Sequence, residues 1–162
     1  MEFFFPSVAC FICGDNLQIG NPIDNRSKGY YNELMITRVA SEEIKNSARD
    51  YPIVGVVGPR QSGKTTLVQA LFPDYQYVNL EAPDLRRFAQ NDPRGFLSTY
   101  SKDVIIDEVQ RVPELFSYLQ VHVDSLKRNG QFILTGSQHF LLMESVSQSL
   151  AGRIALHTLL PL

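Results

Sequence analysis

The sequence has few cysteines, no tryptophan and no strong excess of either charge. Two cysteines in 162 residues are too few for the disulfide framework of a small secreted protein. Lysine and arginine number 15 against 17 acidic residues, and the net charge of −2 excludes a nucleic-acid binder that depends on bulk positive charge. Hydrophobic residues make up 44% and charged residues 20% of the chain, which is typical of a folded domain.

Long apolar segments are also missing from the sequence. No run approaches the roughly 18 apolar residues that a membrane-spanning helix needs. The start of the chain is apolar, but Glu2 stands where a signal peptide carries basic residues, and Pro6 interrupts the run. Cys10 and Cys13 form one CxxC pair without a second, and we interpret them as incidental thiols. We therefore expect a cytoplasmic protein with free thiols and no membrane association.

The chain divides into two parts of different texture. Residues 1–33 are rich in turn-forming residues, and no helical or strand period crosses them, so we expect a poorly ordered leader. Residues 34–162 are expected to form the folded core. There, β-branched runs predict strands near residues 53–57, 75–80, 104–106, 132–134 and 154–160. Helical patterns predict helices near residues 36–48, 63–72, 83–90, 93–100, 113–126 and 140–150, with Asn129 and Gly130 capping the fifth.

Strands that alternate with helices are typical of a parallel sheet covered by helices on both faces. The fold class that we expect is therefore α/β. Ligands of such sheets bind beyond the carboxyl ends of the strands. The segments that follow each predicted strand are accordingly the places to look for functional side chains.

The strongest functional pattern is a phosphate loop of the form G-x-x-x-x-G-K-[ST]. Its residues are Gly58, Pro59, Arg60, Gln61, Ser62, Gly63, Lys64 and Thr65. The loop follows a predicted strand and opens a predicted helix, so backbone N–H groups and the positive helix end can surround phosphate. Lys64 adds a point charge on the phosphates, and Thr65 offers a hydroxyl to Mg²⁺. Arg60 and Gln61 either fix the loop or are solvated.

Two carboxylates follow the third predicted strand. Asp107 and Glu108 come directly after Val104-Ile105-Ile106. Adjacent residues at a strand end point in different directions, so Asp107 can face Mg²⁺ while Glu108 orients an attacking water. Gln110 lies two residues further on, and either a nucleotide contact or a structural role is compatible with its position.

Polar residues also follow the fourth predicted strand. Ser137 and Gln138 are candidates to sense the γ-phosphate, with Thr135 as the next choice. Before the last strand, Arg153 either stabilises γ-phosphate charge, in its own subunit or a neighbouring one, or holds a surface carboxylate. Asp124 interrupts an apolar helical pattern, and we expect an N–H group or a basic partner for it.

Several of these motifs together resemble one family. Gly58-Pro-Arg-Gln-Ser-Gly-Lys-Thr-Thr, Ile106-Asp-Glu-Val-Gln, Val112-Pro-Glu-Leu, Leu134-Thr-Gly-Ser and Leu150-Ala-Gly-Arg are similar, in this order, to motifs of bacterial and archaeal AAA-type ATPases. Members of that family usually carry a C-terminal nuclease-like domain. The resemblance covers roughly residues 35–162, and it implies that this chain is the ATPase core, which stops before any second domain.

The resemblance also implies a fold and a set of roles. The fold is a three-layer P-loop NTPase with a parallel five-stranded sheet in the order 5-1-4-3-2. Gly58 to Thr66 then bind ATP, with Lys64 and Thr65 at the Walker A positions. Asp107 and Glu108 match Walker B, so that Thr65 and Asp107 hold Mg²⁺, and Lys64, Glu108, Ser137 and Arg153 act in catalysis.

Two functions remain open from the sequence. The first is Mg²⁺-dependent ATP hydrolysis that drives a conformational change in a partner or an attached domain. The second is a nucleotide-dependent binding module with little or no turnover. A GTPase lacks support because no N-K-x-D-like motif follows the fourth strand, and the preference for ATP rests mainly on the resemblance. A homo-oligomer, and DNA as a partner, are expectations by family analogy.

Overall fold

A computed structural model of the chain describes residues 40–137 and 149–160. Its strands are β1 (Ile53–Val57), β2 (Gln76–Asn79), β3 (Val104–Asp107), β4 (Phe132–Gly136) and β5 (Ile154–Thr158). Its labelled helices are α2 (Lys64–Leu71), α3 (Pro83–Asn91), α4 (Pro93–Thr99), the 3₁₀ helix η2 (Val109–Arg111) and α5 (Leu115–Leu126). An unlabelled helix covers residues 40–50.

The five strands form one sheet in the order β2-β3-β4-β1-β5, and every neighbouring pair is parallel. This is the expected order 5-1-4-3-2 read from the other edge, and the predicted three-layer α/β fold is confirmed. The connections from β1 to β2, from β2 to β3 and from β3 to β4 each contain at least one helix. Because the strands are parallel, they all end at the same edge, where the phosphate loop follows β1 and the acid pair stands at the end of β3.

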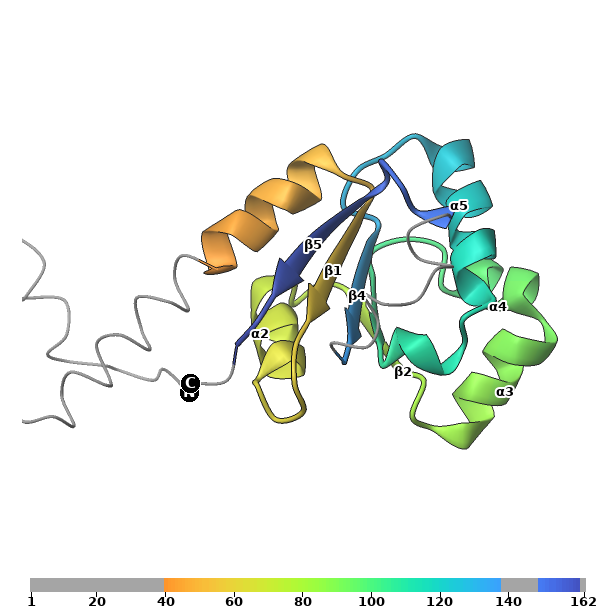
Figure 1. The fold of residues 1–162 in the computed structure, drawn as a ribbon. Helices are drawn as coiled ribbons and strands as arrows, with labels where there is room; N and C mark the ends of the chain where they lie inside the picture. The colour runs from red at the N-terminus through yellow and green to blue at the C-terminus, as the bar shows by residue number, and fades with distance from the viewer. Residues whose placement is uncertain (1–39, 138–148, 161–162) are drawn as a thin grey trace, which may run out of the picture.

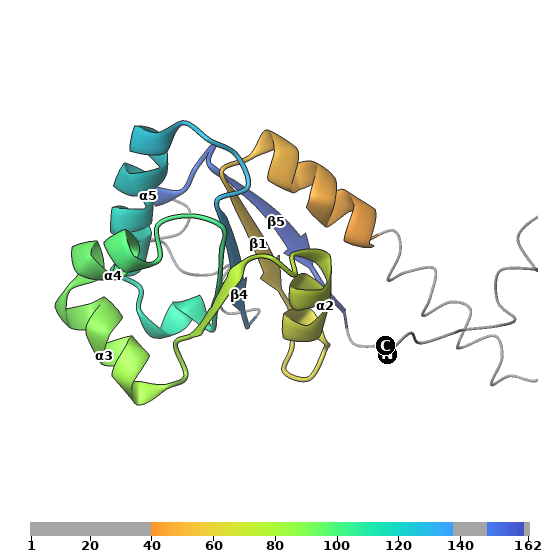
Figure 2. The same ribbon diagram turned by 180° about the vertical axis from the view of Figure 1, so that it is seen from behind.

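The three central strands of the sheet, β3, β4 and β1, are buried on both faces. Figure 1 shows the helix of residues 40–50 and α2 on one side of the sheet and α3, α4 and α5 on the other, and Figure 2 shows the same layers from behind. On β1, Val54 and Val56 pack with Ile44 and Val68 in the first layer, while Ile53 and Val57 belong to the larger core with α3 to α5. A strand covered on both faces is apolar at every position, which explains the continuous run IVGVV.

Local chemistry sets most of the helix ends. Prolines stand in the first turn of α3 and α4, and the Asp92 side chain accepts a hydrogen bond from Gly95 N at 2.8 Å at the start of α4. The helix α5 ends near residue 126 as expected, but its cap differs from the sequence prediction. Lys127 takes the left-handed conformation with φ 47° and ends the helix before Asn129 and Gly130. Gly130 instead lies in the buried turn into β4, where a Cβ atom would meet the carbonyl of Ala48 at 2.7 Å.

Several expectations fall wholly or mainly outside the described residues. These are the leader of residues 1–33, the Cys10–Cys13 pair, the helix near residues 140–150 and Gln138. Within the described part of the chain, no helix is long and apolar enough to cross a membrane.

Candidate functional site

The phosphate loop joins the carboxyl end of β1 to the first turn of α2. Gly58 N donates to Gly136 O at 3.3 Å, which ties the start of the loop to the end of β4. The residue must be glycine, because a Cβ atom there would lie 2.2 Å from the carbonyl oxygen of Leu159. Gln61 and Gly63 have positive φ values of 64° and 77° and turn the chain into the helix. The loop therefore depends on a close backbone approach at one end and a left-handed residue at the other.

Polar bonds inside the loop hold the Lys64 ammonium in place. Lys64 Nζ donates to the carbonyl oxygen of Pro59 at 2.6 Å and to Ser62 Oγ at 3.3 Å. Ser62 Oγ donates to the same Pro59 oxygen at 2.9 Å. Burial lowers the pKa of Lys64 from its usual value of 10.5, while the negative charges of Glu108 and Asp107 oppose that shift. The loop thus holds a desolvated cation, for which an entering anion would be a favourable partner.

The first turn of α2 is open to an anion as well. Gly63 is its N-cap, no side chain caps the exposed N–H groups, and the first turn carries no acidic residue. The helix dipole and these N–H groups favour negative charge at this point. A cavity of about 360 Å³ lies over the loop. It is lined by Arg60, Gln61, Gly63, Lys64, Thr65, Thr66, Glu81 and Glu108.

Asp107 is the hydrogen-bonded centre of the site. Its Oδ2 accepts from Thr65 Oγ1 at 3.1 Å and from the Tyr77 hydroxyl at 2.7 Å. Its Oδ1 accepts from Thr135 Oγ1 and from Glu108 N, the latter at 3.1 Å. Asp107 is only 5% exposed, and Thr135 is fully buried. The two residues predicted to hold Mg²⁺, Thr65 and Asp107, therefore lie in direct contact, on α2 and β3.

Tyr77 at this centre was not predicted from the sequence. Burial and its hydrogen bond to Asp107 raise the pKa of Tyr77, so the phenol keeps its proton and remains a donor. β2 neighbours β3 in the sheet, and Tyr77 pairs with Ile105, which lies two residues before Asp107 and so on the same face of the sheet. The only sequence signal for Tyr77 was a hydroxyl-bearing residue in the strand before β3. Its contact with Asp107 follows only from the register of β2 against β3.

Glu108 turns away from the strand that carries Asp107. Its φ of 56° is left-handed, and it precedes η2. Glu108 Oε2 accepts from Gln110 Nε2 at 2.7 Å, and Glu108 lines the same cavity as Lys64. The adjacent carboxylates thus have different partners, as expected for neighbouring residues at a strand end.

Glu81 is a second residue that the sequence analysis missed. It follows β2, lines the cavity over the phosphate loop, and pairs with Arg111 Nη2 at 3.1 Å. Ser137 lies half-buried directly after β4, at the same edge of the sheet. Both residues therefore stand at the carboxyl edge with the loop.

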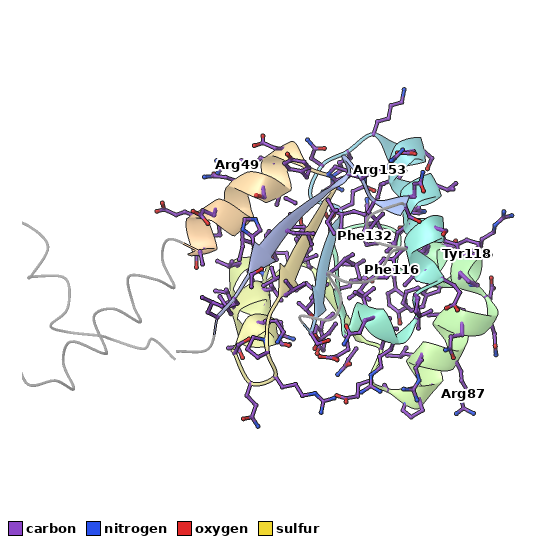
Figure 3. The ribbon with its side chains drawn as sticks, in the orientation of Figure 1. Arg49, Arg87, Phe116, Tyr118, Phe132 and Arg153 are labelled. Atoms are coloured by element: carbon purple, nitrogen blue, oxygen red, sulfur yellow. The ribbon has the colours of Figure 1, made fainter. Side chains whose placement is uncertain are left out.

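The structure does not bring Arg153 to the phosphate loop of its own chain. Arg153 precedes β5, whereas the loop follows β1, and the two strands run parallel, so the residue and the loop lie at opposite edges (Figure 3). Its guanidinium binds Asp124 on α5 with two hydrogen bonds of 2.7 and 2.9 Å. The expected basic partner of Asp124 is confirmed, and Arg153 takes the alternative of holding a surface carboxylate.

A cavity of about 620 Å³, larger than the one over the phosphate loop, lies between α4 and α5. It is lined by Arg94, Leu97, Ser98, Ser101, Ser117, Tyr118, Val121, His122 and Ser125. None of the predicted site residues borders it, so we place the candidate site at the phosphate loop.

The chain has relatives among proteins and solved structures. An uncharacterized protein of Mycobacterium tuberculosis is 36% identical over 126 residues, which are 76% of this chain and 28% of that protein. The chain thus spans about a quarter of the length of the curated relatives it matches. The Walker-type ATPase of Pyrococcus abyssi is similar in fold, with a TM-score of 0.53 and 22% identity over 76% of this chain and 53% of that one. AMPPCP-bound DnaA from Aquifex aeolicus has a TM-score of 0.50 and 22% identity, covering 75% and 44%.

These structural likenesses show the fold, a three-layer α/β P-loop NTPase. Residues 50–162 match the family described as AAA domain. The matched segment contains the phosphate loop, the acid pair and all five strands. The chain therefore belongs to the AAA domain family of P-loop ATPases.

Proposed function

We propose that this domain binds ATP with Mg²⁺ at the phosphate loop and hydrolyses it. The observation that carries the proposal is the 3.1 Å contact between Thr65 Oγ1 and Asp107 Oδ2, with Glu108 and Lys64 lining one cavity beside it. A hydroxyl and a carboxylate from separate elements meet there, next to an anion-binding loop. This combination suits a metal-bound triphosphate.

The nucleotide would be held by residues 58–66. Their backbone N–H groups and the N-terminal end of α2 would bind the phosphates, and Lys64 would exchange its bond to the Pro59 carbonyl for a phosphate oxygen. The exchange is favourable, because an anionic partner offsets the burial that lowers the pKa of Lys64. A Cβ atom at Gly63 would meet no atom within 4 Å beyond its chain neighbours, so the loop leaves open space at that position.

Thr65 and Asp107 fit Mg²⁺ as a pair. In residues 40–137 and 149–160, no group of three or more His, Cys, Asp or Glu side chains forms a metal centre. A hydroxyl and one carboxylate suit an ion that keeps waters and takes its remaining ligands from phosphate. When bound, Mg²⁺ would neutralise charge that develops on the phosphate oxygens. Tyr77 and Thr135 would orient Asp107 toward it.

Glu108 would act on the water. Its carboxylate would accept a proton as the water oxygen forms a bond to the γ-phosphorus and the bond to the β–γ bridging oxygen breaks. Its left-handed backbone directs the side chain toward the cavity rather than along β3. Lys64 is near enough for the two charges to interact, which supports a shared site.

The chain offers a route from nucleotide to an attached segment. Leu159 N donates to Val57 O at 2.7 Å, and the Leu159 carbonyl packs on Gly58. A movement of the loop on nucleotide binding would therefore press on the residues that follow β5. We infer that hydrolysis drives a conformational change in an attached domain, for which the family resemblance favours a nuclease-like one, or in a partner. A homo-oligomer and DNA as a partner rest on the family resemblance alone.

A nucleotide-dependent binding module with little turnover is the second candidate. The position of Arg153 favours it, because the residue is held by Asp124 at the edge away from the loop. If Arg153 is needed for turnover, it must act on the site of a second copy. Turnover would then require assembly, while binding would not.

Phosphate release from the purified chain, measured with ATP and with GTP beside the oligomeric state, tests the proposal. We expect release with ATP and Mg²⁺, loss of release in Glu108→Gln, and retained nucleotide binding in that variant. Tight binding without release would favour the binding module. Equal release from wild type and Glu108→Gln would remove Glu108 from the mechanism.

A further inference from the structure

The side chain of Gln110 contacts Glu108 directly. Gln110 Nε2 donates to Glu108 Oε2 at 2.7 Å, a good length for a hydrogen bond to a charged acceptor. Glu108 borders the cavity over the phosphate loop, whereas Gln110 is not among the residues that line it. The amide therefore binds the carboxylate without itself bordering the cavity where nucleotide would bind.

The orientation of the Gln110 amide is fixed by this contact. Reversing the amide would place its oxygen against a carboxylate oxygen, which is repulsive. In the assigned orientation, Gln110 Oε1 is buried and has no hydrogen-bond partner among the described residues. A buried carbonyl oxygen without a donor is unfavourable, and an apolar side chain of the same size would avoid it. The hydrogen bond to Glu108 is therefore the interaction that a glutamine makes here and an apolar side chain would not.

The backbone beneath Gln110 is well held. Arg111 N donates to Glu108 O at 3.0 Å, and Val112 N donates to Val109 O at 3.1 Å, so η2 is a closed turn. Val109 and Val112 are both fully buried in the larger core. Glu108 and Gln110 thus project from one fixed turn, and the bond between their flexible side chains restricts the rotation of both.

We propose that Gln110 is a positioning residue that holds the Glu108 carboxylate toward the phosphate loop. The inference rests on the proposed function, in which Glu108 accepts the proton of the attacking water. Among the described residues, Glu108 Oε1 has no recorded donor, so the bond to Oε2 leaves one oxygen for water. Fixing that oxygen before water arrives removes the rotational freedom that would otherwise oppose a reactive geometry.

The test compares Gln110→Met with wild type in the full 162-residue chain. Methionine fills a similar volume without an amide. We expect kcat for ATP to fall by about tenfold or more, because misplaced catalytic groups lose at least that much. We expect KM for ATP to stay unchanged and the melting temperature not to fall, because the variant also removes a buried oxygen without a partner.

Gln131 provides a matched control at the opposite edge of the sheet. It is a buried glutamine whose Oε1 also lacks a partner among the described residues, and its Nε2 donates to the Arg128 carbonyl. Gln131→Met removes the same chemical groups but leaves Glu108 untouched. We expect wild-type kcat in this variant.

A second measurement needs no nucleotide. In the NMR spectrum of the protein, the side-chain amide signals of Gln110 are identified by their loss in Gln110→Met. We expect these signals to move in Glu108→Ala while those of Gln131 stay in place. Unmoved Gln110 signals would show that the contact is absent and would overturn the inference.

The outcomes separate the inference from the function beneath it. Wild-type turnover in Gln110→Met, with Glu108→Gln inactive, overturns the positioning role and leaves the proposed function standing. A lowered melting temperature that accounts for the lost activity shows a structural role and also overturns the inference. Absent phosphate release by wild type, or full release by Glu108→Gln, overturns the proposed function and the inference with it.

Discussion

The hydroxyl of Thr65 lies 3.1 Å from Oδ2 of Asp107, although 42 residues separate them along the chain. Thr65 is in the first turn of α2, which follows β1, and Asp107 is the last residue of β3. β4 lies between those strands in the sheet. The contact thus spans the width of a strand, and it brings the loop and the acid pair to one point.

Lys64→Ala tests the phosphate loop. Loss of the ammonium removes charge-assisted hydrogen bonds to phosphate, and we expect Mg²⁺-ATP affinity to fall by about a hundredfold or more. Calorimetric titration or a fluorescent ATP analogue measures it. The exposed Lys102, which precedes β3, is the matched control, and Lys102→Ala should bind as wild type does. Undiminished binding by Lys64→Ala would remove the phosphate-loop assignment.

Two glycines with the same left-handed conformation allow the effect of a substitution on stability to be distinguished from its effect on ATP binding. Gly63 and Gly152 have φ values of 77° and 73°, and at both positions a Cβ atom would meet no atom of a residue beyond the chain neighbours within 4 Å. An alanine in this left-handed region destabilises a protein by about 1 kcal/mol. We expect Gly63→Ala and Gly152→Ala to lose similar stability in denaturant melts, but only Gly63→Ala to weaken ATP binding. Equal ATP affinity in both variants would contradict the role of the Gly63 turn.

Arg153→Ala tests whether the arginine acts at its own site. Because Arg153 is bound to Asp124 beyond the opposite edge of the sheet, we expect ATP affinity within about twofold of wild type, a change too small to matter in free energy. Asp124→Ala, which removes the partner, should behave alike. Phosphate release measured over a range of protein concentrations checks for action between copies. Turnover that rises with concentration in wild type but not in Arg153→Ala would assign the arginine to a neighbouring subunit.

His157 predicts how the stability of the fold depends on pH. Its Nε2 lies 2.9 Å from Ser47 Oγ, joining β5 to the helix of residues 40–50. Burial lowers the pKa of His157 below its usual 6.5, and the charge of Glu43 opposes this shift. As the pH falls, His157 is therefore protonated in the unfolded chain at a higher pH than in the folded protein. The stability that its neutral form contributes is fully present above pH 6.5 and is lost as the pH falls toward the lower pKa of the folded state.

Melting curves at about pH 7.5 and about pH 5.5 measure this effect, since the histidine of the unfolded chain changes from mostly neutral to mostly charged between these two values. We expect the fall in melting temperature to be smaller by about 2 °C in His157→Gln than in wild type. Glu43→Gln should make the fall larger, because it removes the charge that raises the pKa of His157. An equal fall in melting temperature in His157→Gln and in wild type would show that other groups cause the loss of stability at low pH.

Much of the fold could be predicted from the sequence because local patterns specify local structure. The run IVGVV gives a strand buried on both faces, and prolines mark the first turns of α3 and α4. The capping residue of α5 was predicted less accurately. The end of α5 depends on Lys127 in a left-handed conformation, where a basic residue without glycine gives no sequence signal.

The contacts of the candidate site needed long-range register. Tyr77 and Thr135 reach Asp107 because β2 and β4 flank β3, and neither residue lies near Asp107 in sequence. Glu81 enters the cavity for the same reason. Even the contact between Gln110 and Glu108, two residues apart, lies in a turn that starts from a left-handed residue, for which the sequence gives no signal.

The sequence alone determined the phosphate loop and the acid pair, since each is a contiguous segment whose glycines, lysine and carboxylates act through local geometry. The tertiary structure decided which side chains surround Asp107 and which edge of the sheet receives Arg153. Strand order and strand direction set those distances, and both arise from the burial of whole faces of the sheet, a property that no short segment contains.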